Sequence, residues 1–432
     1  MIKKLFKKNF FRNILLVVSG SAGAQAIAMA FTPFITRLYG PEAFGELGAF
    51  VALLGIFTPL VALAYPIAIV LPKSDSAAIG IAKLSLLIAI FTSTFLAFLI
   101  LVWDERLIEL LNLQLTSSFL IFIPIALLGT GSLQVIQQWL IRKKQFKTTA
   151  KVAISQSLIM NISKASAGLL LPLSSVLIIF STVSSFLHAG LLLLGWYKCS
   201  EKNVRTNRVP ISNVSLTELA YCHRDFPLYR APQQFINGLA QSIPVLMLAS
   251  FFGPAAAGFY TLSRTVAGVP ATLISNAVGD VFYPRITAAA NNKEKLFPLL
   301  FKATSSLAVV GLLPFGSLII FGPWLFYFVF GPEWVVAGEY VRYLAPWLYF
   351  IFINAPSNKI IPVLSIQGYY LCFTCCTIII RVLALAIGYY VFKTELASIL
   401  FFSIAGVLLN AILIGAVLII TRNYDNRNSF NE

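Results

Sequence analysis

Charge is scarce in this chain. Of its 432 residues, 11% are Asp, Glu, Lys or Arg and 58% are hydrophobic, which gives a mean hydropathy of +0.85. An ordinary soluble domain carries about 25% charged and about 45–50% apolar residues. The composition therefore excludes a typical soluble domain and predicts an integral membrane protein.

Several chemical motifs are also missing. The sequence has no GxxxxGK[ST] loop, so ATP hydrolysis by this chain is not expected. Cys372 and Cys375 form a CxxC in an apolar run, but no second ligand pair accompanies it. We interpret these cysteines as buried structural thiols and expect neither a metal nor a cofactor.

Acidic residues are the scarcest charged group. There are 16 Asp and Glu against 32 Lys and Arg, and those that approach a hydrophobic span, such as Glu46 and Asp280, lie near its end. A proton- or sodium-coupled drug exporter usually places a carboxylate within the membrane. Cationic groups there suit a phosphate or pyrophosphate, because Arg offers paired donors to phosphate oxygens.

Long apolar runs dominate what is present. A helix needs about 20 mostly apolar residues to cross a bilayer. Twelve such runs lie at 14–36, 45–71, 81–103, 117–140, 152–171, 173–196, 231–252, 259–283, 299–321, 340–362, 369–392 and 395–421. The first follows a basic start that resembles a secretory signal, but eleven more runs come after it, so we expect it to remain as the first helix. The fold class is an all-α membrane protein of about twelve transmembrane helices.

Lys and Arg set the orientation. Twenty-five of the 32 fall at or beside the N-terminus, the C-terminus and alternate loops, four fall on the opposite side and three lie in the interior of spans. Cytoplasmic loops carry the excess of positive charge. We therefore expect a multi-pass protein of the inner (cytoplasmic) membrane with both termini in the cytoplasm. The net charge of +16 then reflects topology, and no nucleic-acid partner is expected.

The two halves of the chain carry related breaks. Gly40-Pro41 follows the first span and Gly253-Pro254 follows the seventh, 213 residues later. The ends of spans two and eight, and Lys164 with Arg381, keep nearly the same offset. Each half has six spans, so the repeats are parallel. We predict two six-helix lobes around a central cavity, with the first lobe at 1–196, a cytoplasmic linker at 197–230 and the second lobe at 231–432.

Arg264 is the first candidate site residue. On a helix, Gly268, Ala271 and Ser275 share its face, which is small and polar like the wall of a cavity. An ionisable group in the membrane suggests function. The alternative is that Arg264 snorkels to the nearby outer surface.

Three further cations are candidates. Arg381 lies in the middle of a span, where snorkelling is difficult, and Lys164 lies within span five. Each suits either a cavity or a structural pairing with a polar neighbour. Arg37 lies near the outer end of span one, where it serves either the site or the membrane interface.

Spans one and seven carry polar stripes. On one face of span one lies Gln25, and on one face of span seven lie Gln234, Asn237 and Gln241. Hydrogen bonding between helices is one interpretation of these amides. The sugar-facing wall of a cavity is the other.

Three segments of the chain resemble the polysaccharide exporters of the multidrug/oligosaccharidyl-lipid/polysaccharide flippase superfamily, the Wzx-type O-antigen flippases in particular. The likeness is carried by 251–286, which contains Arg264 and Pro270, and is supported by 37–50 and 137–146. Drug exporters of the superfamily share the layout, so the layout alone does not decide the substrate.

The resemblance implies a transporter and not an enzyme. It would move an undecaprenyl-pyrophosphate-linked oligosaccharide to the periplasmic leaflet by alternating access, for O-antigen or capsule synthesis. Arg264, with Arg37, Lys164 and Arg381, would hold the pyrophosphate, and the polar stripes would contact sugar. Membrane lipid, a polysaccharide polymerase and chain-length proteins would be its partners. The alternatives are a cation-coupled multidrug antiporter and a membrane polymerase or glycosyltransferase, for which Asp104 or Glu105 would be essential.

Overall fold

The computed structural model of the chain is helical and contains no strand in the residues whose backbone it describes, which are 2–111, 117–201, 215–292 and 294–430. Side chains are described for residues 19–103, 119–198, 215–268, 282–292 and 294–426. The predicted all-α fold class is confirmed. Two compact units divide the chain, unit 1 at Met1–Ala257 and unit 2 at Gly258–Glu432.

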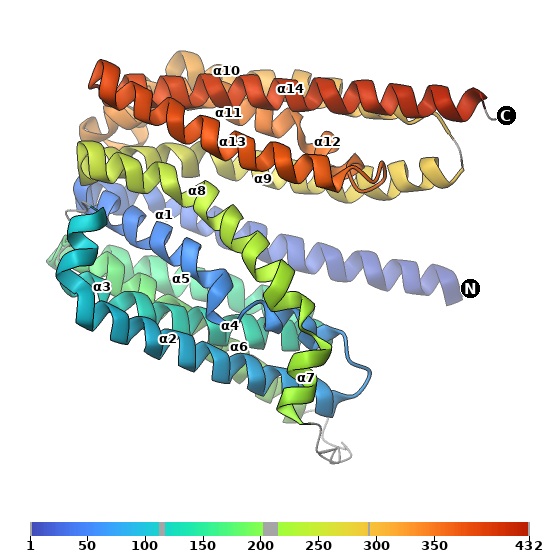
Figure 1. Cartoon of the computed structure of the whole chain (residues 1–432). Helices are drawn as coiled ribbons and strands as arrows, with labels where there is room; N and C mark the ends of the chain where they lie inside the picture. Colours follow the sequence, from blue (N-terminus) through green and yellow to red (C-terminus); the bar gives the residue numbers. More distant parts are fainter. Residues whose placement is uncertain (1, 112–116, 202–214, 293, 431–432) are drawn as a thin grey trace. The chain divides into compact units, whose positions relative to one another are not determined.

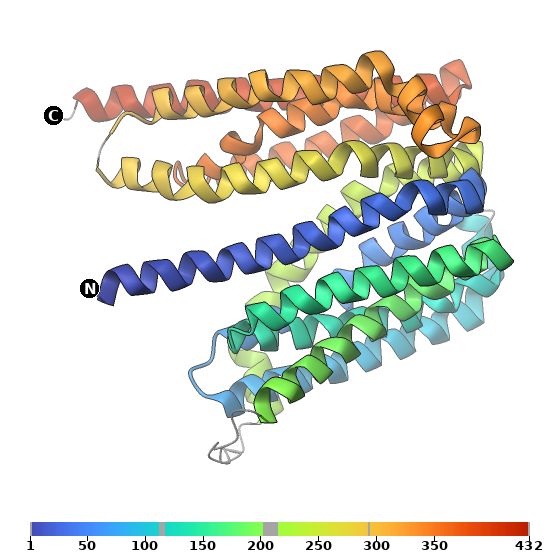
Figure 2. The ribbon, with the colours of Figure 1, turned by 180° about the vertical axis from the view of Figure 1, so that it is seen from behind.

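The helices of unit 1 are drawn from blue to yellow-green in Figures 1 and 2. In chain order they are α1 (Ile2–Val61), the 3-10 helix η1 (Tyr65–Val70), α2 (Asp75–Leu111), α3 (Ser117–Leu120), α4 (Phe122–Arg142), α5 (Phe146–Leu170), α6 (Ser174–Glu201), α7 (Leu216–Cys222), the π-helix η2 (Phe226–Arg230) and α8 (Ala231–Phe252). Helix α1 packs along α5 and α8, while α4 packs against α2 and α6.

Small residues bring α1 and α8 close together. A Cβ built on Gly238 of α8 would lie 2.6 Å from the carbonyl oxygen of Gly55 in α1, and one built on Gly55 would lie 3.2 Å from Ser242 Oγ. Small side chains are the usual means of close helix packing in membranes, where water provides no hydrophobic driving force between helices. The polar stripe of span seven is therefore held on a helix that is fixed to α1.

The helices of unit 2 run from the junction of α8 with α9 to the C-terminus (Figure 1). They are α9 (Pro254–Asn291, most of which lies in unit 2), α10 (Leu296–Phe330), the 3-10 helix η3 (Pro332–Trp334), α11 (Val335–Ile353), α12 (Ala355–Ile360), α13 (Gln367–Ile387), the π-helix η4 (Gly388–Phe392) and α14 (Glu395–Phe430). Helix α11 packs between α10 and α14, and α13 packs against α14.

All twelve predicted spans coincide with helices of the described residues. Spans one and two are joined as α1, which breaks at Gly40, and span ten is divided between α11 and α12. By length and hydropathy alone, seven helices of the described residues are able to cross a membrane. The segment Ser19–Val61 counts as one of these seven although it contains the Gly40 break.

The Gly-Pro breaks share one backbone conformation. Gly40 has φ 71° and ψ 171°, and Gly253 has φ 93° and ψ 175°. Gly331, which precedes Pro332, has φ 110° and ψ 172°. A positive φ favours glycine, and an extended ψ suits a residue before proline. The pair of breaks that indicated the repeat is thus alike in geometry as well as in sequence.

The lobe boundaries at 196 and 231 stay predictions. The compact units divide later, after Ala257, because α8 packs along α1 within unit 1. Each unit therefore holds its own set of the candidate residues, and the two sets are described separately below.

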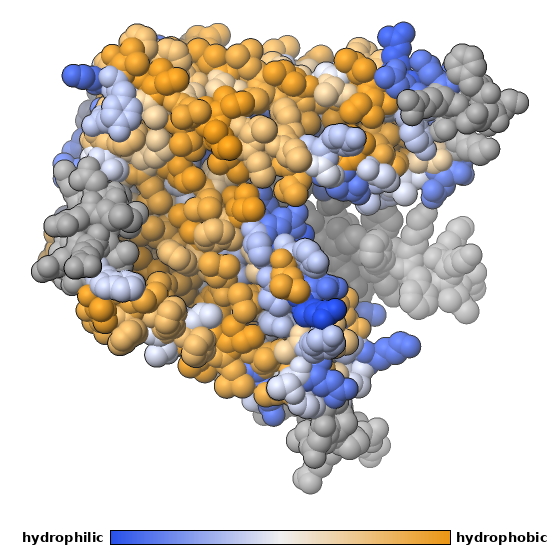
Figure 3. Space-filling view, viewed as in Figure 1, coloured by the Kyte–Doolittle hydropathy of each residue, from blue (hydrophilic) through white to orange (hydrophobic). Residues whose placement is uncertain are grey.

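The outer surface of the helices is apolar. Figure 3 shows hydrophobic residues over most of the visible face, with hydrophilic residues gathered near α7 and the start of α8 and toward the C-terminal end of α14. Leu313 is 81% exposed and Trp324 is 62% exposed. An apolar outer surface of this kind is expected where helices face lipid.

The prediction of buried thiols was wrong. Cys372 and Cys376 are exposed, and Cys375 is half-buried. Leu371, Ile379 and Ile380 of the same helix, α13, are exposed as well. An apolar helix in a membrane protein either packs in the protein core or faces the lipid. Composition does not distinguish them, and this run lies on the outside of unit 2.

Candidate functional site

In unit 1 an apolar groove of about 500 Å³ lies between α1 and α5. It is lined by Phe31, Phe34, Arg37, Leu38, Ala165 and Leu169. Arg37 is the only charged residue among them, and it is exposed. The groove therefore combines a long apolar wall with one cation at its edge.

Lys164 borders the same groove through its neighbour Ala165. Its backbone carbonyl accepts a hydrogen bond of 2.8 Å from the hydroxyl of Tyr39, a residue 5% exposed in the core. A Cβ on Gly168 would lie 2.6 Å from the Tyr39 ring, so that ring is packed directly against α5. The structure thus brings two of the predicted cations, Arg37 and Lys164, to one region of unit 1.

The polar stripes of unit 1 lie largely on its surface. Gln25 of α1 is exposed, as are Asn237 and Gln241 of α8, while Gln234 is half-buried. Asn237 and Gln241 are four residues apart, so they occupy one face of α8. Exposed amides in a hydrophobic chain indicate a face that meets water or a polar ligand more readily than lipid.

In unit 2, Arg264 is half-buried on α9. The preceding residue, Ser263, is fully buried and donates a hydrogen bond of 2.6 Å to the carbonyl oxygen of Ala337 in α11. That bond fixes the rotation of α9 against α11 and with it the direction of Arg264. The side chain of Ser275 lies outside the described residues, so its predicted place on the same face stays a prediction.

Arg381 of α13 lies against aromatic rings. Its guanidinium carbon is 4.1 Å from the ring centre of Trp347 in α11 and 4.0 Å from that of Phe402 in α14. Its Nε atom is buried and has no hydrogen-bond partner among the described residues. Arg264 is close enough that its charge acts on Arg381. The structure therefore brings these two predicted cations near each other within unit 2.

Trp347, Phe402 and Tyr260 were not predicted as site residues. The rings of Trp347 and Phe402 are 5.3 Å apart at their centres, and Tyr260 lies edge-on to Phe402 at 6.3 Å. These residues come from three different helices. The sequence around an aromatic residue in an apolar span does not indicate whether a cation lies beside it in the fold. Only the Arg381 position itself, in the middle of a span, pointed to the need for a partner.

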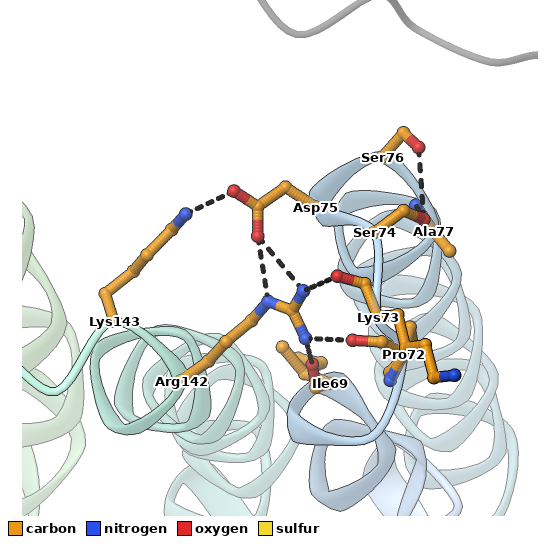
Figure 4. A network of polar contacts seen from close by, with 9 residues as sticks. All are labelled: Ile69, Pro72, Lys73, Ser74, Asp75, Ser76, Ala77, Arg142 and Lys143. Carbon is orange, nitrogen blue, oxygen red and sulfur yellow. Dashed lines mark hydrogen bonds and ion pairs between the residues drawn. The ribbon is translucent and has the colours of Figure 1, made fainter. Parts of the chain in front are cut away.

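A polar network closes one end of unit 1 (Figure 4). Arg142, at the end of α4, donates to Asp75 Oδ1 at 3.0 Å and to the backbone oxygens of Ile69 and Pro72 at 3.2 and 2.6 Å. Lys143 pairs with the other carboxylate oxygen of Asp75. The network joins the loop between η1 and α2 to the loop between α4 and α5, and the charge pattern predicts both loops on the same side of the membrane.

Replacing Asp75 with asparagine is expected to destabilise unit 1 by about 1–3 kcal/mol, because two partly buried cations lose their carboxylate. The side chain of Arg142 is 11% exposed and that of Asp75 is 31% exposed, so solvent screens the pair only in part. Thermal unfolding of the purified protein measures the effect. Glu294→Gln is the matched control, since the Arg285–Glu294 pair is exposed and its loss should leave the melting temperature unchanged.

Unit 2 has its own polar end. The carboxylate of Asp425 accepts hydrogen bonds from the backbone N–H groups of Leu296 and Phe297 at 2.9 and 2.8 Å and so caps the start of α10. Nearby, the hydrogen bond from Arg285 lowers the pKa of Glu294. Neither arrangement offers a site for a substrate, and we assign both to the stability of the helix ends.

The fold is that of a membrane transporter. An inward-facing multidrug resistance MATE family transporter of the MOP superfamily matches with a TM-score of 0.70 at 13% identity, over 94% of this chain and 95% of that one. An outward-facing MATE family transporter of the same superfamily gives 0.61 at 14%, over 97% of each chain. A mutant of the MATE transporter VcmN from Vibrio cholerae gives 0.55 at 15%, over 96% of each. The twelve-helix, two-lobe fold class agrees with this likeness.

The sequence identifies the family. The sequence model of the polysaccharide biosynthesis protein family matches residues 34–339. The chain belongs to that family. The comparison with curated proteins finds no match. The predicted resemblance to superfamily exporters is thereby confirmed, and the chain is a multi-pass membrane transporter of polysaccharide biosynthesis.

Proposed function

We propose that the protein moves an undecaprenyl-pyrophosphate-linked oligosaccharide from the cytoplasmic to the periplasmic leaflet by alternating access. The observation that carries the proposal is the family match over residues 34–339 on a transporter fold. A polysaccharide pathway that builds its sugar on a lipid in the cytoplasm needs such a step, because the sugar headgroup does not cross hydrocarbon unaided.

The charges within the spans support an anionic substrate. Arg37 and Lys164 in unit 1 and Arg264 in unit 2 are the cations that we assign to the pyrophosphate. The exposed Gln25, Asn237 and Gln241, with Gln234 and Ser275, are assigned to the sugar. The apolar wall of the groove beside Arg37 suits the lipid tail. The aromatic surroundings of Arg381 favour a different ligand, which is argued below.

The transport step breaks no bond, so no residue is given a catalytic role. The protein would act in the inner membrane with both termini in the cytoplasm, in O-antigen or capsule synthesis. A polysaccharide polymerase and chain-length proteins would take up the product on the other side.

Proteoliposomes test the proposal directly. Purified protein is reconstituted with an undecaprenyl-pyrophosphate-oligosaccharide that carries a fluorophore on its sugar, and dithionite added outside bleaches the accessible fraction. Without flipping about half of the fluorophore is protected, and an active flippase should reduce that fraction toward zero. Protection equal to that of protein-free liposomes would contradict the proposal.

The drug-antiporter alternative rests on the shared MATE fold. It predicts that expression raises resistance to cationic drugs and that the lipid-linked substrate stays in its leaflet. The polymerase alternative predicts longer sugar chains from the same liposomes and a requirement for Asp104 or Glu105, whose side chains lie outside the described residues.

A further inference from the structure

Arg381 marks a cluster of hydrogen-bond donors inside unit 2. Three atoms there are buried and have no partner among the described residues, namely Arg381 Nε, Trp347 Nε1 and Tyr260 Oη. The Arg and Trp nitrogens are donors only, and a hydroxyl donates as readily as it accepts. A buried donor without an acceptor is costly, and native proteins rarely leave several together.

The three side chains that carry these donors lie around one ring, that of Phe402. Arg381 lies 4.0 Å from the centre of the Phe402 ring, which contacts Trp347 at 5.3 Å and Tyr260 at 6.3 Å. Trp347 is also held in place, because a Cβ on Gly406 would lie 2.4 Å from its indole. The three side chains are therefore neighbours on a packed framework of helices.

The positive charge of the cluster is not balanced by a carboxylate of the described residues. Arg381 forms no ion pair with any of them, and the neighbouring charge of Arg264 repels it. The faces of Trp347 and Phe402 attract the guanidinium, but they accept no hydrogen bond in its plane. What the cluster needs is a compact acceptor with negative charge.

We propose that unit 2 binds a small monovalent anion, of which chloride is the test case, through the Arg381 guanidinium, the Trp347 indole N–H and the Tyr260 hydroxyl. A small anion fits better than the substrate headgroup, because Tyr260 is 0% exposed and Trp347 is 4% exposed. An oligosaccharide pyrophosphate does not reach donors so deeply buried. This site is separate from the pyrophosphate site proposed above and does not depend on it.

The experiment measures thermal unfolding of the full chain in detergent as sodium chloride replaces sodium gluconate at constant ionic strength. A ligand that binds only the folded state raises the melting temperature as its concentration passes the dissociation constant. We expect a saturable rise of about 3 °C or more. Bromide should act like chloride, because both are compact monovalent acceptors.

Tyr260→Phe keeps its ring and Trp347→Phe replaces the indole with a smaller aromatic ring, and each removes one donor. Both should fold and should weaken the response to chloride at least about tenfold in concentration, the loss of one hydrogen bond to a charged group. Trp324→Phe and Tyr369→Phe are the matched controls, because both residues are exposed at 62% and 82% in the same unit. Their chloride response should equal that of the unmodified protein.

Three outcomes would overturn the proposal. The melting temperature of the unmodified protein does not depend on chloride, or the dependence persists in Trp347→Phe and Tyr260→Phe together, or only inorganic pyrophosphate raises it. The last result would assign the cluster to the substrate headgroup. Because none of these measurements involves transport, the anion site and the flippase proposal fail independently.

Discussion

Arg264→Ala is expected to reduce polysaccharide export at least about tenfold while the folded protein remains near its normal level. A hydrogen bond to a charged group contributes about 1.5–3 kcal/mol, which is about 10- to 150-fold in binding or rate. Arg264 is half-buried, and the hydrogen bond from the neighbouring Ser263 to Ala337 holds α9 against α11. Export is measured as surface polysaccharide in a strain that lacks its own flippase.

Two further variants decide between roles for Arg264. Arg264→Lys keeps the charge but loses the planar pair of donors, so we expect partial export. Arg285→Ala removes an exposed arginine from the same helix and should export normally. Normal export by Arg264→Ala would instead favour the alternative in which Arg264 snorkels to the membrane surface.

Gly45→Ala is expected to abolish folding or to destabilise the protein by at least about 3 kcal/mol, at the upper end of the cost of overpacking. A Cβ at Gly45 would lie 1.6 Å from the carbonyl oxygen of Pro254 and 2.4 Å from its carbonyl carbon. Both are backbone atoms, so no side-chain rotation relieves the clash. The folded yield after size-exclusion chromatography and the melting temperature measure the effect.

Gly190→Ala provides the matched control. Gly190 lies in α6 of the same unit, and a Cβ there would meet nothing within 4 Å. Alanine should be neutral or stabilising by about 0.5–1 kcal/mol, since it reduces the conformational entropy of the unfolded chain. If Gly45→Ala melts like the unmodified protein, the close approach of α1 to the start of α9 does not exist in solution.

Hydropathy predicted most of the fold. The twelve spans matched helices because a long apolar run has few other stable forms in a membrane. The Gly-Pro breaks were predictable from the amino-acid sequence, since glycine readily adopts the positive φ that Gly40 and Gly253 show. The thiols of α13 were placed wrongly because an apolar run does not reveal which of its faces meets lipid.

The candidate site was less predictable. Sequence identified Arg37, Lys164, Arg264 and Arg381 as cations in or near spans, but their surroundings depend on helices far apart in the chain. The rings beside Arg381 come from α11 and α14, and the groove beside Arg37 is completed by α5. Spacing along one helix carries no information about such partners, so only the structure groups Arg37 with Lys164 and Arg381 with Arg264.

The three Gly-Pro corners bear on how helices of this protein are able to bend. Each corner combines a glycine at positive φ with the fixed ring of a proline, and few other backbone states are open to that pair. The corners at Gly40 and Gly331 each lie within one unit, and there the proline limits the backbone states of the glycine before it, so the helices on either side turn as one hairpin. Bending during transport then falls to helix interiors, where Pro33, Pro59, Pro244 and Pro314 each remove a backbone hydrogen bond and leave the helix softer.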